Sequence, residues 1–378
     1  MPTSALWPLL VAFCALPMAG CARSTGYRVH WGDVHGHTNI SDGKGSLDDY
    51  FTHARRVARL DFAIVTDHDF GNAHPWWMPK EAWKLTQDKA DEYTAPGRFV
   101  AIAGYEWTSQ TKYWTEVGGN EISERLFPGP PRLYNHKNVY FPTRVDYLLC
   151  AKDAAYKDPD SLAEAVSKRG GLIHNAHPGS GPDEREQFDY ARRHDSVITN
   201  TEMLPDVIHH EGKAHQVKGE QMVREFLNRG GRTGFISGTD THECEPRART
   251  AILAKELTRE AIFDALRHRR NYAIWNARIV VDFRIDGHLM GEEIETAGKP
   301  RITVSVKGTH AIAELAIIRN GAILLSRNPG RRSVKLEHVD ESFVGDSYYY
   351  VRVTQADVDE HGNPSRAWTS PIWVNRKR

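Results

Sequence analysis

The segment Asp33-Val34-His35-Gly36-His37, with Asp42 five residues further on, carries the residue types best suited to metal chemistry. Side chains alternate between the two faces of an extended strand, so His35 and His37 point the same way. Imidazole nitrogen and carboxylate oxygen are ordinary ligands of divalent metal ions. The segment therefore predicts one corner of a metal site. The alternative is a surface strand that happens to carry two histidines.

Further ligand-type residues follow short apolar runs elsewhere in the chain. The runs at 62–66, 99–103, 171–173, 197–199 and 233–237 are each typical of a buried strand. The ligand-type residues that come at or just after their ends are Asp67, His68, Asp69, Glu106, His174, His177, Glu202, Asp240 and His242. In parallel α/β folds the carboxyl ends of the strands hold the chemistry. One such acid alone could be a helix cap, but five strand ends of this kind favour a shared site.

Amphipathic helices are predicted between these runs. The expected helices are 47–60, 162–169, 216–229 and 259–269. Ser46 with Asp49, and Ser161 with Glu164, have the spacing of a helix-capping pair. The alternation of strands and helices predicts an α/β domain over residues 27–275, with a parallel sheet that is either open or closed into a barrel.

The pattern changes after this domain. Ile302, Val304 and Val306 alternate with polar residues, and Asn320-Gly321 is a strong hairpin-turn signal. Helical periodicity longer than two turns is absent from about Ala277 onwards. We predict a small all-β sandwich over residues 277–378. It carries no cluster of ligand-type residues, so packing or a contribution to the substrate edge is expected of it.

Composition excludes several classes of protein. The chain of 378 residues is 40% hydrophobic, which suits a folded globular protein of two domains. Its 49 basic and 49 acidic residues balance, so no net field attracts nucleic acid or anionic lipid. Histidine is abundant, with 19 residues, and many stand beside Asp, Glu or Gly. That clustering is typical of metal-binding proteins.

Residues 1–21 resemble an export leader. The apolar stretch from Ala5 to Met18 is too short to span a bilayer, which needs about 20 such residues. Small residues then lead to Cys21, as in the lipobox of bacterial lipoproteins, where the cysteine is lipidated. We therefore expect an exported protein of a bacterium, either periplasmic or a membrane-anchored lipoprotein. A cleaved secreted protein and an uncleaved or buried helix are the alternatives.

The cysteine count limits the type of metal site. Of four cysteines, Cys14 leaves with the leader and Cys21 is the predicted lipid anchor. Cys150 and Cys244 remain, and export permits a disulfide between them without requiring one. Two cysteines cannot form a four-cysteine zinc knuckle. Any metal here is expected to be held by His, Asp and Glu.

In their order, these motifs resemble the PHP (polymerase and histidinol phosphatase) superfamily. The motifs are Asp33-x-His35-x-His37, Ser41-Asp42-Gly43, Thr66-Asp67-His68-Asp69, Gly104-Tyr105-Glu106, His177-Pro178 and Gly238-Thr239-Asp240-Thr241-His242. The likeness covers about residues 28–245, and the segment 135–138 with the trailing β-domain is similar to an exported branch. The resemblance implies a distorted (β/α)7 barrel. It also implies two or three divalent ions (zinc, manganese or iron) that hydrolyse phosphate esters.

The resemblance also implies which residues hold each ion. The first ion is assigned to His35, His37, Glu106 and Asp240. Glu106 is expected to bridge to a second ion held with His136 and His177. A third ion is assigned to Asp42, His68 and His242. Many relatives have histidine where Asp42 stands, which leaves the identity and occupancy of the third ion open.

Other residues are assigned supporting roles. Asp33 and Asp67 are expected to orient neighbouring imidazoles rather than bind metal. His174 is an alternative to His136 as ligand, or a partner of a ligand, and Glu202 is a candidate hydrogen-bond acceptor. Lys137 and Arg247 are candidates for gripping phosphate, with solvated surface charge as the alternative for each.

These residues predict a metal-dependent phosphoesterase acting on a small phosphate mono- or diester. A bridging carboxylate holds two ions about 3.5–4 Å apart, which suits in-line displacement at phosphorus. Glu106 and Asp240 are the predicted catalytic carboxylates, and no nucleic-acid polymer is expected as partner. The alternatives are a metal hydrolase of C–N or C–O bonds, commonly built on a carboxylated lysine, and a non-catalytic surface protein with structural metals. The sequence leaves the oligomeric state open.

Overall fold

The structure is a computed structural model of the chain. It describes residues 26–70, 77–109, 134–151, 153–180, 187–210 and 213–377. The predicted leader, residues 1–21, lies outside the described residues. Within the described ranges no helix is long and apolar enough to cross a membrane. No disulfide joins Cys150 to Cys244.

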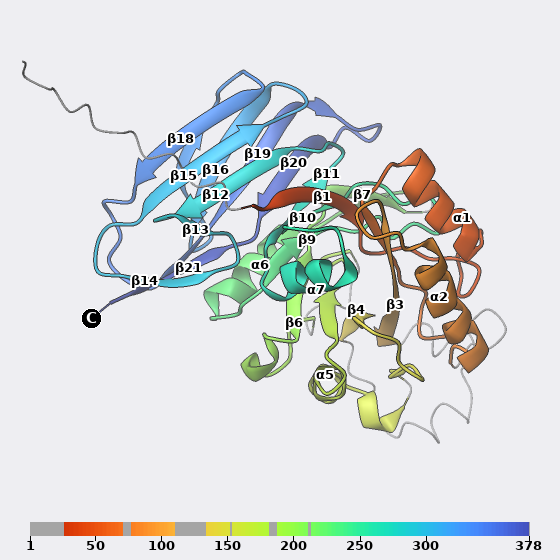
Figure 1. Ribbon diagram of the computed structural model, residues 1–378. Helices are drawn as coiled ribbons and strands as arrows, with labels where there is room; N and C mark the ends of the chain where they lie inside the picture. Colours follow the sequence, from red (N-terminus) through yellow and green to blue (C-terminus); the bar gives the residue numbers. More distant parts are fainter. Residues whose placement is uncertain are drawn as a thin grey trace, which may run out of the picture.

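The N-terminal part is built on a mixed sheet (Figure 1). Its strands are β1 (Arg28–Asp33), β2 (Phe62–Val65), β3 (Val100–Ser109), β4 (Asn135–Tyr140), β5 (Leu172–Asn175), β6 (Ile198–Glu202), β9 (Gly234–Ile236) and β10 (Thr250–Ala254). Hydrogen bonds join them in the order β10-β1-β2-β3-β4-β5-β6-β9. Most neighbours are parallel, but β4 is antiparallel to both β3 and β5, and β10 is antiparallel to β1. A separate hairpin is formed by β7 (Val207–His210) and β8 (Lys213–Gln216).

The α/β class is confirmed, but a closed (β/α)7 barrel is not shown. Among the described residues the strand order ends at β9, which forms no ladder with β1. Beyond the strands, Gly36 forms a single bridge with Thr241, and the N–H of Asp240 donates to the carbonyl of His35 at 3.0 Å. β9 is only three residues long, and the chain after it leaves the extended conformation, with a φ of 52° at Asp240. The chain therefore ends its ladder before the sheet can close.

All four predicted helices are present, with shifted ends. They are α1 (Leu47–Thr52), which continues as a π-helical turn (His53–Val57), α5 (Pro159–Ser167), α6 (Gly219–Asn228) and α7 (Arg259–Arg267). Short 3₁₀ turns occupy Ala154–Tyr156 and Arg192–His194. A further helix, α2 (Lys80–Tyr93), has no counterpart in the prediction. Its buried residues include Thr86 and Gln87 beside Trp83 and Ala90, so it shows no clear apolar stripe.

One of the two predicted capping pairs is confirmed. The Ser46 hydroxyl accepts the N–H of Asp49 at 3.2 Å, and the Asp49 carboxylate accepts the N–H of Ser46 at 2.9 Å. The pair predicted at Ser161 is wrong, because α5 begins earlier. Asp158 caps this helix by accepting the N–H of Ser161 at 2.8 Å. Pro159 at the first helical position explains the earlier start, since its fixed φ suits that position and no N–H is needed there.

Helices bury both faces of the N-terminal strands. Leu47 and Phe51 of α1 pack in one apolar cluster with Ala63 and Val65 of β2. The alternate residues of the same strand, Phe62 and Ile64, pack with Ile262 and Phe263 of α7 in a second cluster. Such two-sided burial explains why β2 is apolar along its whole length. It also leaves the edge beyond the strands as the place for polar side chains.

The C-terminal part contains two packed sheets. One is β13-β12-β15-β18, formed by β12 (Val280–Ile285), β13 (His288–Leu289), β15 (Arg301–Lys307) and β18 (Ser333–Val339). The other contains β14 (Glu293–Thr296), β16 (Ile312–Arg319), β17 (Ala322–Arg327), β19 (Ser347–Val358), β20 (Pro364–Thr369) and β21 (Ile372–Arg376). One apolar cluster lines both sheets, and the predicted Asn320-Gly321 turn joins β16 to β17 with positive φ at both residues.

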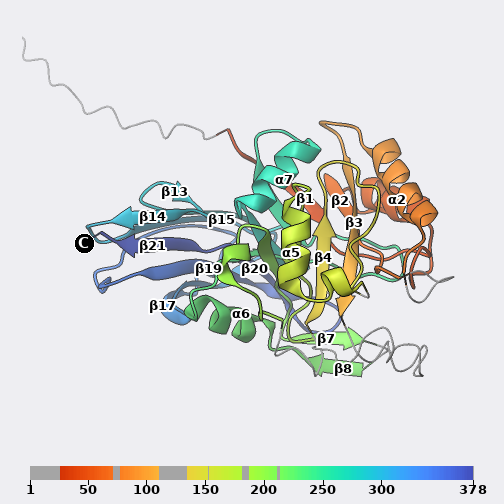
Figure 2. The same cartoon turned by 90° about the horizontal axis from the view of Figure 1, so that it is seen from below.

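The second of these sheets continues into the N-terminal sheet. β11 (Asn271–Trp275) pairs with β10 on one side and with β20 on the other (Figure 1). α6 lies beside β19 and β20 (Figure 2), and its Glu220 carboxylate accepts hydrogen bonds from Tyr350 at 2.8 Å and Trp368 at 3.1 Å. The two predicted domains therefore share a continuous sheet, and the boundary between them near residue 276 remains a prediction.

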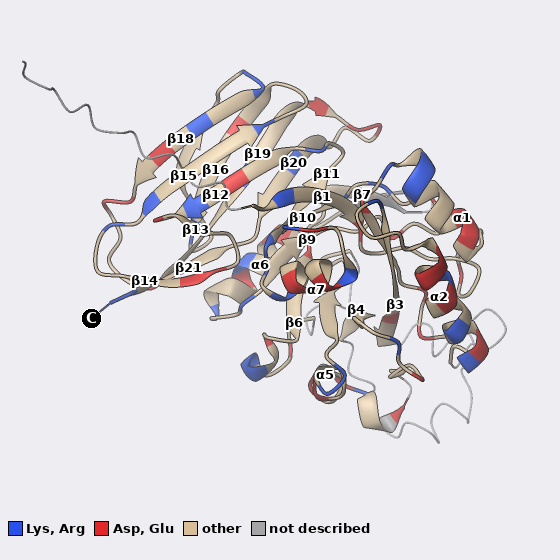
Figure 3. Ribbon diagram, in the orientation of Figure 1, with Lys and Arg blue, Asp and Glu red and all other residues tan. Residues whose placement is uncertain are grey.

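Charged residues are scattered over the whole fold. Figure 3 shows Lys and Arg interspersed with Asp and Glu on the helices and strands of both parts. This arrangement agrees with the balance of 49 basic and 49 acidic residues. The charged groups that bear on function are instead gathered inside the molecule.

Candidate metal centre

Ligand-type side chains gather at one edge of the mixed sheet. Those in segments that follow a strand are His35, His37, Asp42, His68, His177, Asp240 and His242. Glu106 lies inside β3, because this strand continues to Ser109 instead of ending before Glu106. His136 is the second residue of β4. Since β4 runs antiparallel to β3 and β5, its first residues meet the carboxyl ends of those strands.

The first group contains His35, His37, Glu106 and Asp240. The Nε2 atoms of His35 and His37 lie 3.3 Å apart, and Asp240 Oδ1 lies 3.4 and 3.0 Å from them. Glu106 Oε1 lies 3.3 Å from the first nitrogen, and Oε2 lies 3.4 Å from the second. Ligand atoms about 2.0–2.1 Å from one tetrahedral ion lie about 3.3–3.4 Å from each other. The atoms of His35, His37 and Asp240 therefore have the spacing of ligands of one tetrahedral ion, and Glu106 offers a different oxygen to each histidine.

The second group shares Glu106. Its Oε1 lies 2.7 Å from His136 Nδ1 and 3.2 Å from His177 Nε2, and its Oε2 lies 3.1 Å from His68 Nδ1. The Glu106 side chain is 1% exposed. Among the described residues, Glu106 Oε2 and His136 Nε2 are buried without a hydrogen-bond partner. Such orphaned atoms cost free energy unless a ligand satisfies them, and a divalent ion at the ligand groups would satisfy Glu106 Oε2.

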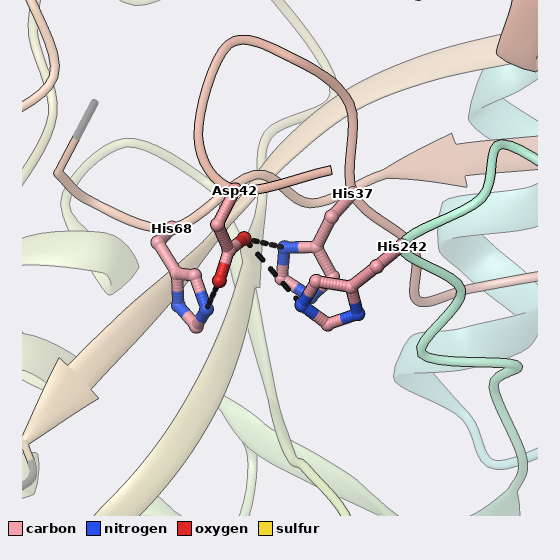
Figure 4. A group of neighbouring side chains, drawn as sticks. All are labelled: His37, Asp42, His68 and His242. Atoms are coloured by element: carbon pink, nitrogen blue, oxygen red, sulfur yellow. Dashed lines mark ion pairs between the residues drawn. The ribbon is translucent and has the colours of Figure 1, made fainter. Parts of the chain in front are cut away.

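The third group surrounds Asp42 (Figure 4). Its carboxylate lies between three imidazoles, 3.7 Å from His37 Nδ1, 3.5 Å from His68 Nε2 and 3.4 Å from His242 Nε2. These separations are longer than those of the first group. They indicate a looser ligand set that an ion would draw together.

The structure brings all nine predicted ligands into these groups. They are His35, His37, Asp42, His68, Glu106, His136, His177, Asp240 and His242. His37 faces two groups, one with each ring nitrogen. The buried imidazoles and carboxylates suit divalent ions of the zinc, manganese and iron kind. Which residue binds which ion remains a prediction.

Hydrogen bonds from neighbouring side chains fix three of the imidazoles. These contacts are His35 Nδ1 to Glu202 Oε1 (3.1 Å), His68 Nδ1 to Thr108 Oγ1 (2.7 Å) and His177 Nδ1 to Ser180 Oγ (3.0 Å). Each leaves the Nε2 atom facing a ligand group, which is how proteins orient metal-binding imidazoles. Thr108 and Ser180 are absent from the sequence prediction. Alternation along β3 could have found Thr108, because it lies on the same face as Glu106.

The three groups open to solvent on one side. The side chains of Asp240, His242 and Asp42 are 41%, 38% and 28% exposed. Those of His35 and His37 are fully buried. The exposed acids and imidazole therefore form the rim from which a substrate could approach, while the buried residues form the floor.

Opposite charges hold the cluster together. Burial alone would raise the pKa of Glu106, but the imidazoles of His136 and His35 hold the pKa of this carboxyl well below its usual range. Burial lowers the pKa of His177, yet its hydrogen bond to Glu106 and the charges of Asp240 and Glu106 together outweigh this and raise the pKa to about 9. His242 behaves likewise beside Asp42, with a pKa of about 9. An ion bound here therefore competes with protons for these imidazoles.

The prediction that Asp33 and Asp67 orient imidazoles is wrong in its detail. The Asp33 carboxylate accepts hydrogen bonds from the N–H of Thr239 (3.0 Å), the hydroxyl of Thr239 (2.6 Å) and the N–H of Arg247 (3.0 Å). The Asp67 carboxylate accepts from the backbone and hydroxyl groups of Thr38 and Ser41, at 2.7–3.1 Å. Both acids therefore hold the backbone of ligand-bearing segments.

His174 does not join the metal groups. It lies in β5, packs edge-on against the ring of Tyr140 at 4.6 Å, and places Nε2 3.4 Å from the amide nitrogen of Asn200. Burial lowers its pKa to about 3, so it stays neutral. His136 and not His174 lies against Glu106, in agreement with the ligand set taken from the resemblance.

The two predicted phosphate-gripping residues differ in their surroundings. Lys137 follows His136 in β4 and therefore points to the opposite face. Its buried Nζ donates to the carbonyls of Tyr134 (2.8 Å) and Gln187 (3.0 Å). The Arg247 side chain is 55% exposed and lies 3.6 Å from Glu245. The contacts of Lys137 contradict a role in gripping substrate, whereas that of Arg247 remains a prediction.

Lys137→Met is expected to leave the metal content unchanged and to destabilise the fold. The substitution leaves two buried carbonyls without their donor, at a cost of about 1–3 kcal/mol each. Elemental analysis and thermal unfolding measure the two effects. Lys84→Met, at a lysine that is 71% exposed, is the matched control and should change neither. A fall in metal content in the Lys137 variant alone would restore a role for Lys137 at the site.

Comparison with known proteins identifies relatives without a described activity. A family model described as "Protein of unknown function (DUF3604)" matches residues 68–117. An uncharacterized protein of Chlamydia trachomatis is 26% identical over 388 residues, which cover 94% of this chain and 59% of the relative. The same values hold for an uncharacterized protein of Chlamydia muridarum. The chain thus spans 59% of the length of these relatives.

The chain is also similar to one solved two-domain structure. This protein, from Bacteroides vulgatus, is described as containing a predicted PHP-like metal-dependent phosphoesterase. It is 14% identical, with a TM-score of 0.48, and the match covers 90% of this chain and 95% of that chain.

Proposed function

We propose that this chain is a metal-dependent hydrolase of phosphate esters that uses two or three divalent ions. The order of its motifs, which resembles that of the PHP superfamily, supports the proposal. The gathering of nine ligand-type side chains into groups that share members supports it independently. The substrate is a small phosphate mono- or diester.

The position of Glu106 is the observation that carries the proposal. Oε1 of this buried carboxylate faces His35, His136 and His177, and its Oε2 faces His37 and His68. A carboxylate shared between two ligand groups holds two ions about 3.5–4 Å apart, the separation that serves in-line displacement at phosphorus. A purely structural metal site has a single closed shell and needs no shared ligand.

The residues of the floor and those of the rim have different roles. Ions bound here would stabilise anionic oxygens and make water acidic enough to act as a nucleophile at neutral pH. Glu106, His35 and His37 orient them from below. Asp240 lies at the rim. Burial raises the pKa of its carboxyl group, but nearby imidazoles outweigh this and hold the pKa below its usual range. The carboxylate is therefore ionised and can accept a hydrogen bond from the attacking water.

Hydrolysis of C–N or C–O bonds is the alternative. Related metal hydrolases of that kind commonly bridge their ions through a carboxylated lysine. Here Glu106 takes the shared position, and the nearby Lys137 Nζ is engaged by two carbonyls. The geometry therefore favours phosphate esters.

Turnover of model esters tests the proposal. The chain loaded with manganese or zinc is expected to hydrolyse p-nitrophenyl phosphate or bis(p-nitrophenyl) phosphate, and chelator should abolish the activity. Activity should return when the metal is restored. An amide and carboxyl-ester panel runs in parallel. Metal-replete protein that hydrolyses only those substrates, or none, would refute the phosphoesterase.

A further inference from the structure

Glu202 contacts two histidines of the metal centre. It ends β6, and its side chain is 1% exposed. Oε1 lies 3.1 Å from His35 Nδ1, and Oε2 accepts the N–H of His177 at 2.8 Å. Both histidines face Glu106 Oε1, and with Asp240 they form one group of ligand-type side chains. One carboxylate therefore holds two neighbouring residues of the metal centre.

Both contacts require an acceptor. The His177 backbone offers an N–H, which is only a donor. His35 must carry its proton on Nδ1 when Nε2 faces the ligand group, so it too is a donor toward Glu202. A glutamine has one acceptor and one donor end, and can satisfy only one of the two. An aspartate is shorter by one methylene and cannot reach both. Glutamate alone fits.

The local backbone is built around this carboxylate. His177 has a φ of 27°, an unusual conformation for a residue with a side chain. The hydrogen bond from its N–H to Glu202 holds it there. Gly238 passes close by, and a Cβ on it would lie 2.7 Å from Glu202 Oε1 and 2.3 Å from His35 Cβ. The chain thus keeps an open space in which the carboxylate and the imidazole meet.

We infer that Glu202 is a positioning residue that sets the ring orientation of His35 and the backbone of His177 together, and so fixes two candidate ligands of the metal centre with one carboxylate. The inference rests on the metal centre of the proposed function. It does not require a particular substrate. Losing this carboxylate should weaken metal binding at the group that His35 and His177 form with Asp240.

Glu202→Gln in the full chain tests the inference. Zinc affinity, measured by competition with a chromophoric chelator, should fall about 10- to 100-fold, as is typical when the partner of a ligand histidine is lost. Cobalt substitution gives a second readout, because its visible absorption reports the ligand geometry. The cobalt spectrum of the variant should differ from that of the parent at full loading. Glu202→Asp, which keeps the charge, should show a smaller loss.

Asp340→Asn is the matched control. Asp340 is a buried carboxylate in the C-terminal part that accepts hydrogen bonds from Tyr349 and Ser342. Its substitution should lower thermal stability without changing zinc affinity or the cobalt spectrum. Unchanged affinity and spectrum in both Glu202 variants would overturn the inference, as would an equal loss in the control. These readouts need no turnover, so a protein inactive on phosphate esters would leave the inference standing if zinc affinity falls as expected.

Discussion

Glu106→Gln is expected to remove at least one metal ion per chain and to lower kcat/KM for phosphate esters by at least about 10³-fold. The carboxylate contacts both ligand groups, and an amide offers a neutral oxygen on one side and a donor on the other. The N–H donor of this amide would face ring nitrogens of the imidazoles, which also point toward the position of the carboxylate. A loss of several kcal/mol in stabilising the transition state corresponds to this fold-change.

Elemental analysis and steady-state kinetics measure this effect. The control is Glu220→Gln, at a half-buried carboxylate that joins α6 to the C-terminal part through Tyr350 and Trp368. It should keep both the metal and the activity while unfolding at a lower temperature. Full metal content in the Glu106 variant would remove the shared-ligand role, and with it the main support for the proposed chemistry.

Most ligands could be predicted from the sequence because their positions follow a simple rule. An apolar run followed at once by His or Asp marks a strand end, and strand ends of a parallel sheet meet. His35, His68 and Asp240 obey this rule. His136 does not, because β4 is antiparallel and places its start, rather than its end, at the site. Only the resemblance to a family pointed to it.

The supporting residues were harder to predict, because their role depends on contacts between distant segments. Asp33 and Asp67 have the sequence signature of partners of histidine, yet they bind backbone and hydroxyl groups. Glu202 has the same residue type and is separated from His35 by 167 positions, and it alone of the three contacts an imidazole. Nothing in the local pattern distinguishes them. Lys137 was equally hard to place from the local pattern, because alternation along β4 points its side chain away from the face of its neighbour His136.

The closed barrel and the domain boundary likewise depend on pairing between strands that are distant in the sequence. The apolar pattern of 62–66 or 233–237 predicts a strand but not its partners. Closure would need β9 to pair with β1, and its three residues end too early. The sheet continues from β11 into β20. These two strands pair residues about 100 positions apart, and no local feature of the sequence predicts that pairing.

Metal binding should stabilise this protein more strongly as the pH rises from 6.5 to 9. Without metal, the folded cluster keeps protons on His177 and His242, whose pKa values are raised to about 9. Their contribution to stability is complete below the unfolded pKa of about 6.5 and is lost as the pH rises to 9. Metal-bound imidazoles are neutral, so the loaded protein does not lose stability in this way.

The difference in unfolding temperature between metal-loaded and chelator-treated protein measures this effect. Lys137 acts in the opposite direction, because burial lowers its pKa to about 7 and its contribution grows with pH. It lies outside the ligand groups, so it affects both forms equally and cancels in the difference. His177→Gln should flatten the dependence on pH, whereas His288→Gln, at an exposed histidine of the C-terminal part, should leave it intact. A difference that stays constant or shrinks toward pH 9 would show that the imidazoles of the cluster do not exchange protons for metal.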